Sequence, residues 1–438
     1  MSAPPSLGRP LSGAEAALLR PDPRLGIPLP AYGGRSLPNV AATVARAVGG
    51  DDAGPVPFAA SLAPDLDPLE GRRPEGPIVV LLADGLGWFS FDRWTRAARA
   101  PSAARWGRLA RPITTVFPTT TVPALVSLSS GTAPSQNGVV GYRQFLPGFG
   151  VVADLLKMSP VGVPQPETLV GPDWSPALVS GAPSIFRRGA HGVAVSREKF
   201  QGSGLTRLLY DGAEYVPYAT ASDLAHLLVD RIGAEHPPPV IYTYWDELDT
   251  VQHWRGPVDR LFGFEAERLA HLLEFVAREV DPARARRTTV LVTADHGQVP
   301  LDPARQLRVD LTPEIAREMS RPLAGDRRAG YFSALPGREG ALHDALRAAL
   351  PEGSRLLRMG EALDAGLFGP PPYHPELRAR LGELLALVPE PTGLVALPPG
   401  ARPSARGEFL GGHGGLSAEE LLVPLVRGGL ADFGDGGA

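Results

Sequence analysis

The chain has 438 residues, a formal net charge of −4 and no cysteine. Its length is more than one ordinary domain needs and is enough to bury a large core. The lack of cysteine excludes disulfides, thiolate metal sites and cysteine nucleophiles. Any metal must therefore be held by Asp, Glu, His or hydroxyl groups. The mildly acidic balance implies no general attraction to nucleic acid or to an anionic membrane.

Residues 1–75 are rich in Pro and Gly and predict an N-terminal extension that packs on the core, with one helix over 39–48. The N-terminus has no uninterrupted apolar stretch, and no later stretch approaches the length of a membrane span. We therefore expect a soluble, cytoplasmic protein without a membrane partner.

The first buried strand is predicted over 78–83, where an uninterrupted apolar run ends at Asp84 and Gly85. In open α/β sheets the carboxyl ends of the strands carry the ligands. Asp84 therefore stands where a metal ligand or a catalytic acid would lie. A simple Asp-Gly turn is the alternative interpretation.

A helix is predicted to begin at Thr121, because an apolar segment with Pro123 in its first turn follows and Gly131 stands at its end. Free backbone N–H groups and the helix dipole attract an anion to such a position, and phosphate is the usual one. The Thr121 hydroxyl there becomes a nucleophile if a metal or a base removes its proton. A plain helix N-cap is the alternative. The loop over 131–143 follows, and its polar groups are candidates for lining a pocket.

A second buried strand is predicted over 239–245, shortly before Asp249 and His253. These two residues are four apart, so one helical turn places both on one face, where they could hold a cation. A solvent-exposed ion pair is the alternative. A further strand is predicted over 192–196, with a helix before it. Two more helices are predicted over 223–232 and 259–280.

A third buried strand is predicted over 288–294 and ends at adjacent Asp295 and His296. An acid and a histidine side by side at a strand end favour a metal site. His413 lies among glycines, which permit close approach of the backbone, and the last strand is predicted over 421–425.

The strands alternate with helices, which predicts an α/β fold with a mostly parallel central sheet sandwiched by helices. We expect the catalytic core to comprise 76–297 together with 407–438. Between them, 298–406 is expected to form a smaller inserted cap that decides specificity, with helices over 340–350 and 374–387 and a strand over 330–335.

Five segments, taken in order, resemble the alkaline phosphatase superfamily and specifically its nucleotide pyrophosphatase/phosphodiesterase family. They are VVLLADGLG, FPTTTVP with the downstream SLSSG, DTVQHWRGP, TADHG and GGHGG. The resemblance implies two zinc ions, with manganese as an alternative metal. The implied ligands are Asp249, His253 and His413 for one ion, and Asp84, Asp295, His296 and the Thr121 hydroxyl for the other.

The resemblance further implies that Thr121 attacks phosphorus and forms a covalent phospho-threonine, which water then hydrolyses. The chain departs from the family at two positions. Tyr142, followed by Arg143, stands where the family usually has an Asn that donates to a phosphoryl oxygen, and Asn137 replaces a His. All three residues are candidates for substrate binding, and an arginine could grip a terminal phosphate bidentately.

We therefore expect a two-metal hydrolase of phosphodiester or pyrophosphate bonds in small, nucleotide-like substrates, with no nucleic-acid partner. A phosphomonoesterase or a phosphonate hydrolase of the same superfamily is the first alternative. A non-catalytic protein that binds phosphorylated ligands is the second. The sequence leaves the oligomeric state open.

Overall fold

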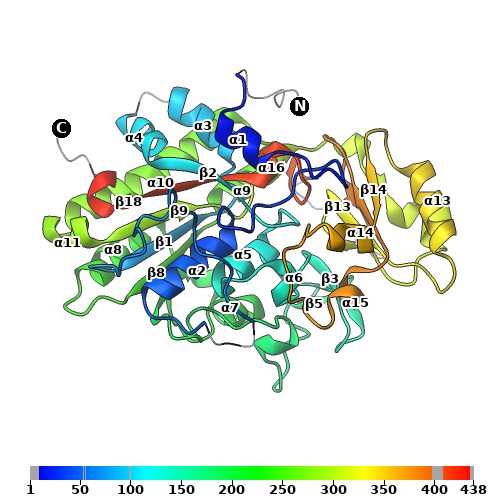
Figure 1. Ribbon diagram of the computed structural model, residues 1–438, viewed down its shortest axis with the longest axis horizontal. Coiled ribbons are helices and arrows are strands. Elements are labelled where there is room, and N and C mark those ends of the chain that lie inside the picture. Colours follow the sequence, from blue (N-terminus) through cyan, green and yellow to red (C-terminus); the bar gives the residue numbers. More distant parts are fainter. Residues whose placement is uncertain (1–8, 53, 55, 98–99, 397–407, 435–438) are drawn as a thin grey trace.

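The computed structural model describes residues 9–52, 54, 56–97, 100–396 and 408–434. A seven-stranded central sheet has the strand order β2-β18-β9-β1-β8-β6-β7 (Figure 1). Its strands are β1 (Ile78–Ala83), β2 (Ala110–Thr114), β6 (Gly192–Arg197), β7 (Glu214–Tyr218), β8 (Val240–Trp245), β9 (Thr289–Thr293) and β18 (Leu422–Gly429).

Most of this sheet is parallel, as the sequence predicts. β1 pairs in parallel with β8 and β9, and β6 pairs in parallel with β7 and β8. β18 runs antiparallel to both of its neighbours, β9 and β2. All six residues of β1 are buried, which is why their sequence is a continuous apolar run without the alternation of a half-exposed strand.

Helices cover both faces of the central sheet (Figure 1). On one face α10 packs against α3, α4, α8 and α9, and on the other α5 packs between α2 and α7. The helices of this part are α1 (Gly13–Leu18), α2 (Leu37–Ala47), α3 (Trp88–Ala97), α4 (Pro101–Leu109), α5 (Thr121–Ser130), α6 (Pro134–Asn137), α7 (Gly204–Leu209), α8 (Ala221–Gly233), α9 (Glu247–Arg255), α10 (Asp259–Glu279), α11 (Pro282–Arg287) and α16 (Ala418–Leu421). The expected helix-sheet-helix sandwich is confirmed.

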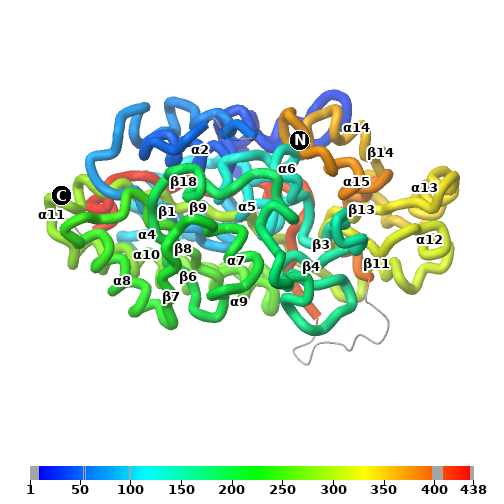
Figure 2. Tube along the Cα trace, turned by 90° about the horizontal axis from the view of Figure 1, so that it is seen from below, coloured from blue at the N-terminus to red at the C-terminus, as the bar shows by residue number. Residues whose placement is uncertain are grey.

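A second seven-stranded sheet, antiparallel throughout, has the order β14-β15-β13-β12-β3-β4-β5. Its strands are β3 (Arg143–Leu146), β4 (Val151–Asp154), β5 (Ser159–Pro160), β12 (Ala324–Gly325), β13 (Ala329–Phe332), β14 (Arg355–Arg358) and β15 (Leu384–Leu387). With α12 (Pro313–Ala316), α13 (Glu339–Ala349), α14 (Met359–Asp364) and α15 (Leu377–Leu381) it occupies one end of the molecule (Figure 2).

This second sheet takes strands from two distant parts of the chain. β12 to β15 belong to the expected inserted region, whereas β3 to β5 come from 143–160, a stretch expected to belong to the core. The two parts join where Gly325 of β12 pairs with Arg143 of β3. The division of the chain into three stretches stays a prediction. The second sheet takes its strands from two of these stretches.

Two sequence predictions in these regions are wrong. The helix predicted over 374–387 is instead the short α15, which Gly382 ends with a φ of +78°, followed by β15. β15 is an apolar run of four residues buried between β13 and β14, and so short a run does not distinguish a strand from a helix. The segment just before β6 contains only a 3-10 turn at Pro176–Leu178 where a helix was expected.

Two short pairs of strands complete the fold. β10 (Val299–Pro300) pairs antiparallel with β17 (Gly411–Gly412), and β11 (Leu307–Arg308) pairs in parallel with β16 (Leu394–Val395). Within the described ranges, no helix has the length and apolar character needed to cross a membrane. The cytoplasmic location stays a prediction.

His374 forms a contact between the two parts of the molecule. Its ring fits between Gly138 and Gly181, where a Cβ on either glycine would approach ring atoms to 2.6 and 2.5 Å. Its Nδ1 accepts the backbone N–H of Glu376 at 3.2 Å, which requires a neutral ring. Burial, helped by the charge of Arg380, lowers the pKa of His374 to about 4. Protonation therefore opposes this packing.

We expect His374 to make the protein sensitive to acid. Because its pKa is lower in the folded state than in the unfolded chain, its contribution to stability is complete above the ordinary histidine pKa and is lost as the pH falls toward 4. His374→Gln should flatten the fall in Tm between pH 7 and pH 4. His226→Gln, at an exposed position of α8, should leave that slope unchanged. Identical slopes for wild type and His374→Gln would contradict the prediction.

Candidate metal centre and active site

Three neighbouring strands bring the acidic groups of the site together. β8, β1 and β9 pair in parallel, so their carboxyl ends meet at one edge of the sheet. Asp84 directly follows β1, Asp295 lies two residues beyond β9, and Asp249 lies in the first turn of α9, just after β8. Gly85, with a φ of +76°, allows this convergence, because a Cβ there would lie 3.0 Å from the Cα of Asp249.

The first candidate metal group comprises Asp84, Asp295 and His296, all fully or nearly fully buried, with ligand atoms within 4.8 Å of one another. The Nε2 of His296 lies 3.5 Å from Oδ1 of Asp84 and 3.3 Å from Oδ2 of Asp295. Thr121 Oγ1 lies 3.2 Å from the same Nε2. These are the four residues expected to share one metal, and the fold brings them together.

The second candidate group comprises Asp249, His296 and His413, again within 4.8 Å. His253 adjoins it, because its Nε2 lies 3.3 Å from Oδ1 of Asp249 and its ring centroid is 5.1 Å from that of His413. The rings of His296 and His413 stack with their centroids 3.7 Å apart. The residues expected to hold the other metal therefore also lie together, and His296 lies within reach of both groups.

The three histidines share one hydrogen-bonding arrangement. In each ring Nδ1 faces a backbone carbonyl oxygen and donates to it as N–H. The acceptors are the carbonyls of Gly411 for His253 (2.9 Å), Gly297 for His296 (3.2 Å) and Thr119 for His413 (3.1 Å). This tautomer leaves the lone pair of every Nε2 directed at the acidic groups, as metal-ligating histidines require.

The electrostatics of the groups call for a cation. Burial, together with the charges of Asp295 and Asp249, raises the pKa of Asp84 well above its ordinary value. Burial and the neighbouring histidines lower the pKa of His413, which keeps its ring neutral. Oδ1 of Asp84 and Oδ2 of Asp295 are buried without a hydrogen-bond donor among the described residues. Carboxylate oxygens that face imidazole lone pairs repel them unless a cation lies between, so these residues fit a divalent metal.

The glycines around His413 are required by close packing. β17 pairs with β10 and so brings the His413 loop beside the Asp295-His296 strand end. A Cβ at Gly411 would lie 2.4 Å from the carbonyl oxygen of Gln252, one residue before His253. The expected close approach of the backbone is therefore present, and it connects His413 with α9.

Thr121 is the first residue of α5, as predicted. Thr120 is the extended N-cap, and Gly131 ends the helix in the left-handed conformation with a φ of +68°. Pro123 occupies a first-turn position whose N–H would have no helical acceptor, so the helix tolerates it. The side chain of Thr121 thus lies at the positive end of a buried helix, beside both metal groups.

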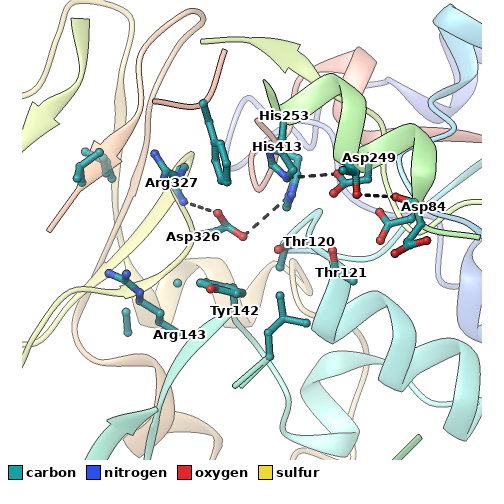
Figure 3. Close-up of a pocket in the computed structure, with 18 of the residues that line it drawn as sticks. Asp84, Thr120, Thr121, Tyr142, Arg143, Asp249, His253, Asp326, Arg327 and His413 are labelled. Atoms are coloured by element: carbon teal, nitrogen blue, oxygen red, sulfur yellow. Dashed lines mark hydrogen bonds and ion pairs between the residues drawn. The ribbon is translucent and has the colours of Figure 1, made fainter. Parts of the chain in front are cut away.

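A cavity of about 400 Å³ opens in front of these residues, at the junction of the two sheets (Figure 3). Asp84, Thr121, Asp249, His253 and His413 line it from the core side. Tyr142 and Arg143 also line it. Asn137 does not: its side chain is fully buried and bonds to Thr132, Ser127 and the N–H of Val139.

The hydroxyl of Tyr142 has a partner inside the protein. It donates to Oδ2 of Asp154 at 2.9 Å, and burial with this carboxylate raises its pKa. Its proton is therefore engaged, and the phenol presents its ring and its oxygen lone pairs to the cavity. Sequence reasoning cannot detect this, because Asp154 lies on β4 in a part of the chain without a recognisable motif.

The sequence reasoning missed other residues that line the cavity, among them Asp326, Arg327, Tyr244 and Phe409. Asp326 and Arg327 form the turn between β12 and β13, Tyr244 lies near the end of β8, and Phe409 stacks on His253 with ring centroids 4.5 Å apart. Asp326 lies between Arg327 and His413, with its Oδ2 3.9 Å from Nδ1 of His413 (Figure 3). Of these four, only Tyr244 had a usable signal, its place beside a strand end that carries ligands.

The sequence profile described as type I phosphodiesterase / nucleotide pyrophosphatase matches residues 78–391. The chain belongs to this family. The match runs from β1 through the second sheet and thus includes Asp84, Thr121, Asp249, His253, Asp295 and His296. It is a family of hydrolases within the alkaline phosphatase superfamily. The curated proteins searched contain no match to the chain.

Solved structures share the fold at low sequence identity. Murine ectonucleotide pyrophosphatase/phosphodiesterase 5, an inactive form in complex with AMP, is 18% identical with a TM-score of 0.59, over 81% of this chain and 88% of that chain. The human protein of the same name is 15% identical with a TM-score of 0.59, over 80% and 87%. Phosphonoacetate hydrolase from Sinorhizobium meliloti, in complex with phosphonoacetate, is 18% identical with a TM-score of 0.58, over 83% and 96%.

We expect Asp295→Asn and His413→Gln each to weaken metal binding, because each removes a ligand from one of the two groups. Metal analysis after dialysis against zinc should give less zinc per chain for both variants than for wild type. Chelation should lower the Tm of the wild type, since a metal that binds only the folded state stabilises it. The matched control is His271→Gln, at an exposed position of α10. Unchanged zinc content in both ligand variants would contradict the assignment.

Tyr244 orients Asp84 through its hydroxyl, which donates to Oδ2 of that carboxylate. We expect Tyr244→Phe to lower metal affinity by about tenfold, the effect usual for residues that orient a ligand. Competition with a fluorescent zinc chelator would measure it. Tyr215→Phe is the matched control, because that hydroxyl bonds to the carbonyl of Arg197, away from the cavity. Equal zinc affinities for Tyr244→Phe and wild type would show that Asp84 needs no such support.

Proposed function

We propose that the protein is a metal-dependent hydrolase of phosphodiester or pyrophosphate bonds that uses Thr121 as its nucleophile. The observation that carries this proposal is the position of Thr121 Oγ1 at the start of α5, on the cavity wall and 3.2 Å from His296 Nε2. A buried hydroxyl directed at two groups of metal ligands is placed for attack on a phosphoryl group and has no evident structural purpose.

The cofactor we propose is a pair of zinc ions, with manganese as the alternative. Ligands drawn only from carboxylates and imidazoles suit zinc, and the chain has no thiol to offer. When bound, such cations would lower the pKa of the Thr121 hydroxyl and offset the negative charge of the phosphoryl oxygens. Asp84, Asp295, His296 and Thr121 would hold one ion, and Asp249, His253 and His413 the other.

The reaction would proceed in two displacements. Thr121 loses its Oγ proton and attacks phosphorus, so that the Oγ–P bond forms while the bond from phosphorus to the leaving oxygen breaks. The proton of Thr121 passes to solvent, and the leaving oxygen takes up a proton from solvent. Water then attacks phosphorus: the new P–O bond forms, the Oγ–P bond breaks, one proton of the water is released, and Thr121 Oγ regains a proton. The free N–H groups in the first turn of α5 would donate to the phosphoryl oxygens in both steps.

The cavity also has a wall for an organic group. Leu156, Leu323, Leu394 and Phe409 contribute apolar surface to it, beyond the reacting groups. Such a wall suits the nucleoside or other organic portion of an ester better than it suits inorganic phosphate. The AMP bound by the murine relative agrees with a nucleotide-like substrate.

A phosphonate hydrolase or a phosphomonoesterase is the second candidate. Arg143 lines the cavity, and its positive charge suits a substrate that carries more negative charge than a simple diester. A phosphonoacetate hydrolase is also among the proteins with a similar fold. The same nucleophile and metal groups would serve either reaction. The preference is therefore a question for direct measurement.

We expect Thr121→Ala to abolish hydrolysis while zinc content stays that of wild type, because three protein ligands remain in each group. The loss should be about a thousandfold or more. Thr121→Ser should retain part of the activity, since it keeps a hydroxyl at the same position. The substrates are bis-p-nitrophenyl phosphate, p-nitrophenyl phosphate, the p-nitrophenyl ester of thymidine monophosphate, and phosphonoacetate.

The pattern of rates separates the candidates. Fastest cleavage of the thymidine ester supports the nucleotide phosphodiesterase, whereas fastest cleavage of p-nitrophenyl phosphate or phosphonoacetate supports the second candidate. Full activity in Thr121→Ala would refute the nucleophile. Zinc-loaded wild type that cleaves none of the four would favour a non-catalytic protein that binds phosphorylated ligands.

A further inference from the structure

Two arginines face the cavity on the side away from the metal groups. Figure 3 shows Arg143 and Arg327 across the cavity from Thr121 and Asp84, with Tyr142 and Asp326 between. Arg143 lies on β3, and Arg327 lies in the turn after β12, the strand that pairs with β3 through Gly325 and Arg143. The architecture of the second sheet thus holds two positive charges at one end of the cavity.

The guanidinium of Arg327 forms no ion pair with any of the residues that the structure describes. Among the described residues, no carboxylate oxygen lies within ion-pair distance of it, and Oδ1 of the adjacent Asp326 instead accepts the backbone N–H of Arg327 at 2.5 Å. Its guanidinium carbon lies 4.9 Å from the ring centroid of Phe409, which supports it as a flat platform. Burial lowers the pKa of Arg327, opposed by Asp326 and reinforced by the nearby charge of Arg143.

The guanidinium of Arg143 also has few polar partners among the described residues. Within the described part of the chain, its side chain makes one hydrogen bond, from Nη1 to the carbonyl oxygen of Ala396 at 3.1 Å. The third cation of the cavity, Lys199, differs, because its Nζ lies 2.6 Å from Oδ2 of Asp246. Two neighbouring guanidinium groups with free N–H donors repel each other in a partly buried cavity, and an anion between them would relieve that repulsion.

We propose that Arg143 and Arg327 form a subsite for a second anionic group of the substrate, separate from the phosphorus that reacts at Thr121. The substrate class is accordingly a phosphate or phosphonate compound that carries another phosphate or a carboxylate at its far end. Planar guanidinium groups bind either of these anions bidentately. This inference rests on the proposed function, since it takes the metal groups as the place of the reacting phosphorus.

The proposal also explains the apolar wall. Leu323 and Leu394, from the same part of the chain as Arg327, line the cavity together with the two arginines. A substrate that spans it would place a short organic linker against these side chains and an anion at each end. Arg143 would then select the substrate by its distal charge and would take no part in holding the reacting phosphoryl group.

Calorimetric titration of the zinc-loaded protein tests the subsite without requiring turnover. The ligands are propylphosphonate, which has one anionic group, and two series with linkers of one to four carbons, the ω-carboxyalkylphosphonates and the α,ω-bisphosphonates. The proteins are wild type, Arg143→Gln, Arg327→Gln, the double variant and Arg327→Lys. Arg347→Gln, at an exposed position of α13, is the matched control. Tm and zinc content establish that each variant is folded and loaded.

We expect the second anion to tighten binding to wild type by about tenfold or more at the best linker length. In the double variant this advantage should fall below about threefold, and Arg327→Lys should keep part of it. Arg347→Gln should keep all of it. A larger gain from the carboxylates or from the bisphosphonates identifies which anion the subsite prefers.

Two results would overturn the subsite: no gain from a second anion in wild type, or a gain that persists in the double variant. Failure of the proposed function would look different. Wild type would then cleave none of the p-nitrophenyl esters, and yet the gain from the second anion and its loss in the double variant would still be measured.

Discussion

Electrostatic repulsion among the carboxylates of Asp84, Asp249 and Asp295 is the constraint on which the rest of the site depends. The parallel pairing of β1 with β8 and β9 makes their convergence unavoidable, because each strand ends at the same edge of the sheet. Asp84 and Asp295 are also buried, and one oxygen of each has no donor among the described residues. The three imidazoles hydrogen-bond to backbone carbonyls through Nδ1 and so present their Nε2 atoms to these carboxylates. A cation bound among these residues would offset the repulsion, so the arrangement that the fold creates fits a metal site.

The two sheets are joined by a buried ion pair close to this site. Nε of Arg328, directly before β13, lies 3.1 Å from Oε1 of Glu420 on α16, and both side chains are almost completely buried. The same carboxylate oxygen accepts the N–H of Gly415, in the loop that carries His413. Loss of one partner of such a pair leaves an unpaired buried charge. One carboxylate therefore connects the second sheet with the loop that carries His413, a candidate metal ligand.

Much of the core could be predicted because its signals are local. Buried parallel strands produce continuous apolar runs, and the ligands follow those runs at fixed offsets, so the order of residues alone was enough to place Asp84, Asp295 and His296 at strand ends. Thr121 had a proline and a terminal glycine to mark its helix. Asp249 and His253 had helical spacing.

The specificity side of the cavity carried no such signals. Asp326 and Arg327 lie in a short polar turn whose composition is that of any exposed loop, and their placement depends on β12 pairing with β3, far away in sequence. Asn137 stands where the family has a His and was therefore expected to bind substrate, but its hydrogen bonds are satisfied within its own loop. Strand β15 was mistaken for helix because four apolar residues fit either period. Non-local pairing decides each of these cases.

The candidate reacting groups of the cavity lie at the edge of the central sheet, whereas its two guanidinium groups come from the second sheet and one of its turns. This separation affects how related proteins can differ in sequence. The turn between β12 and β13 consists of only three residues, Asp326, Arg327 and Arg328. Exchange of Arg327 would alter the charge at the second-sheet end of the cavity while the candidate metal ligands, which lie on other elements, stay in place. Relatives with the same metal ligands can therefore diverge in substrate while their chemistry stays constant, and the β12–β13 turn is where sequence variation among them should concentrate.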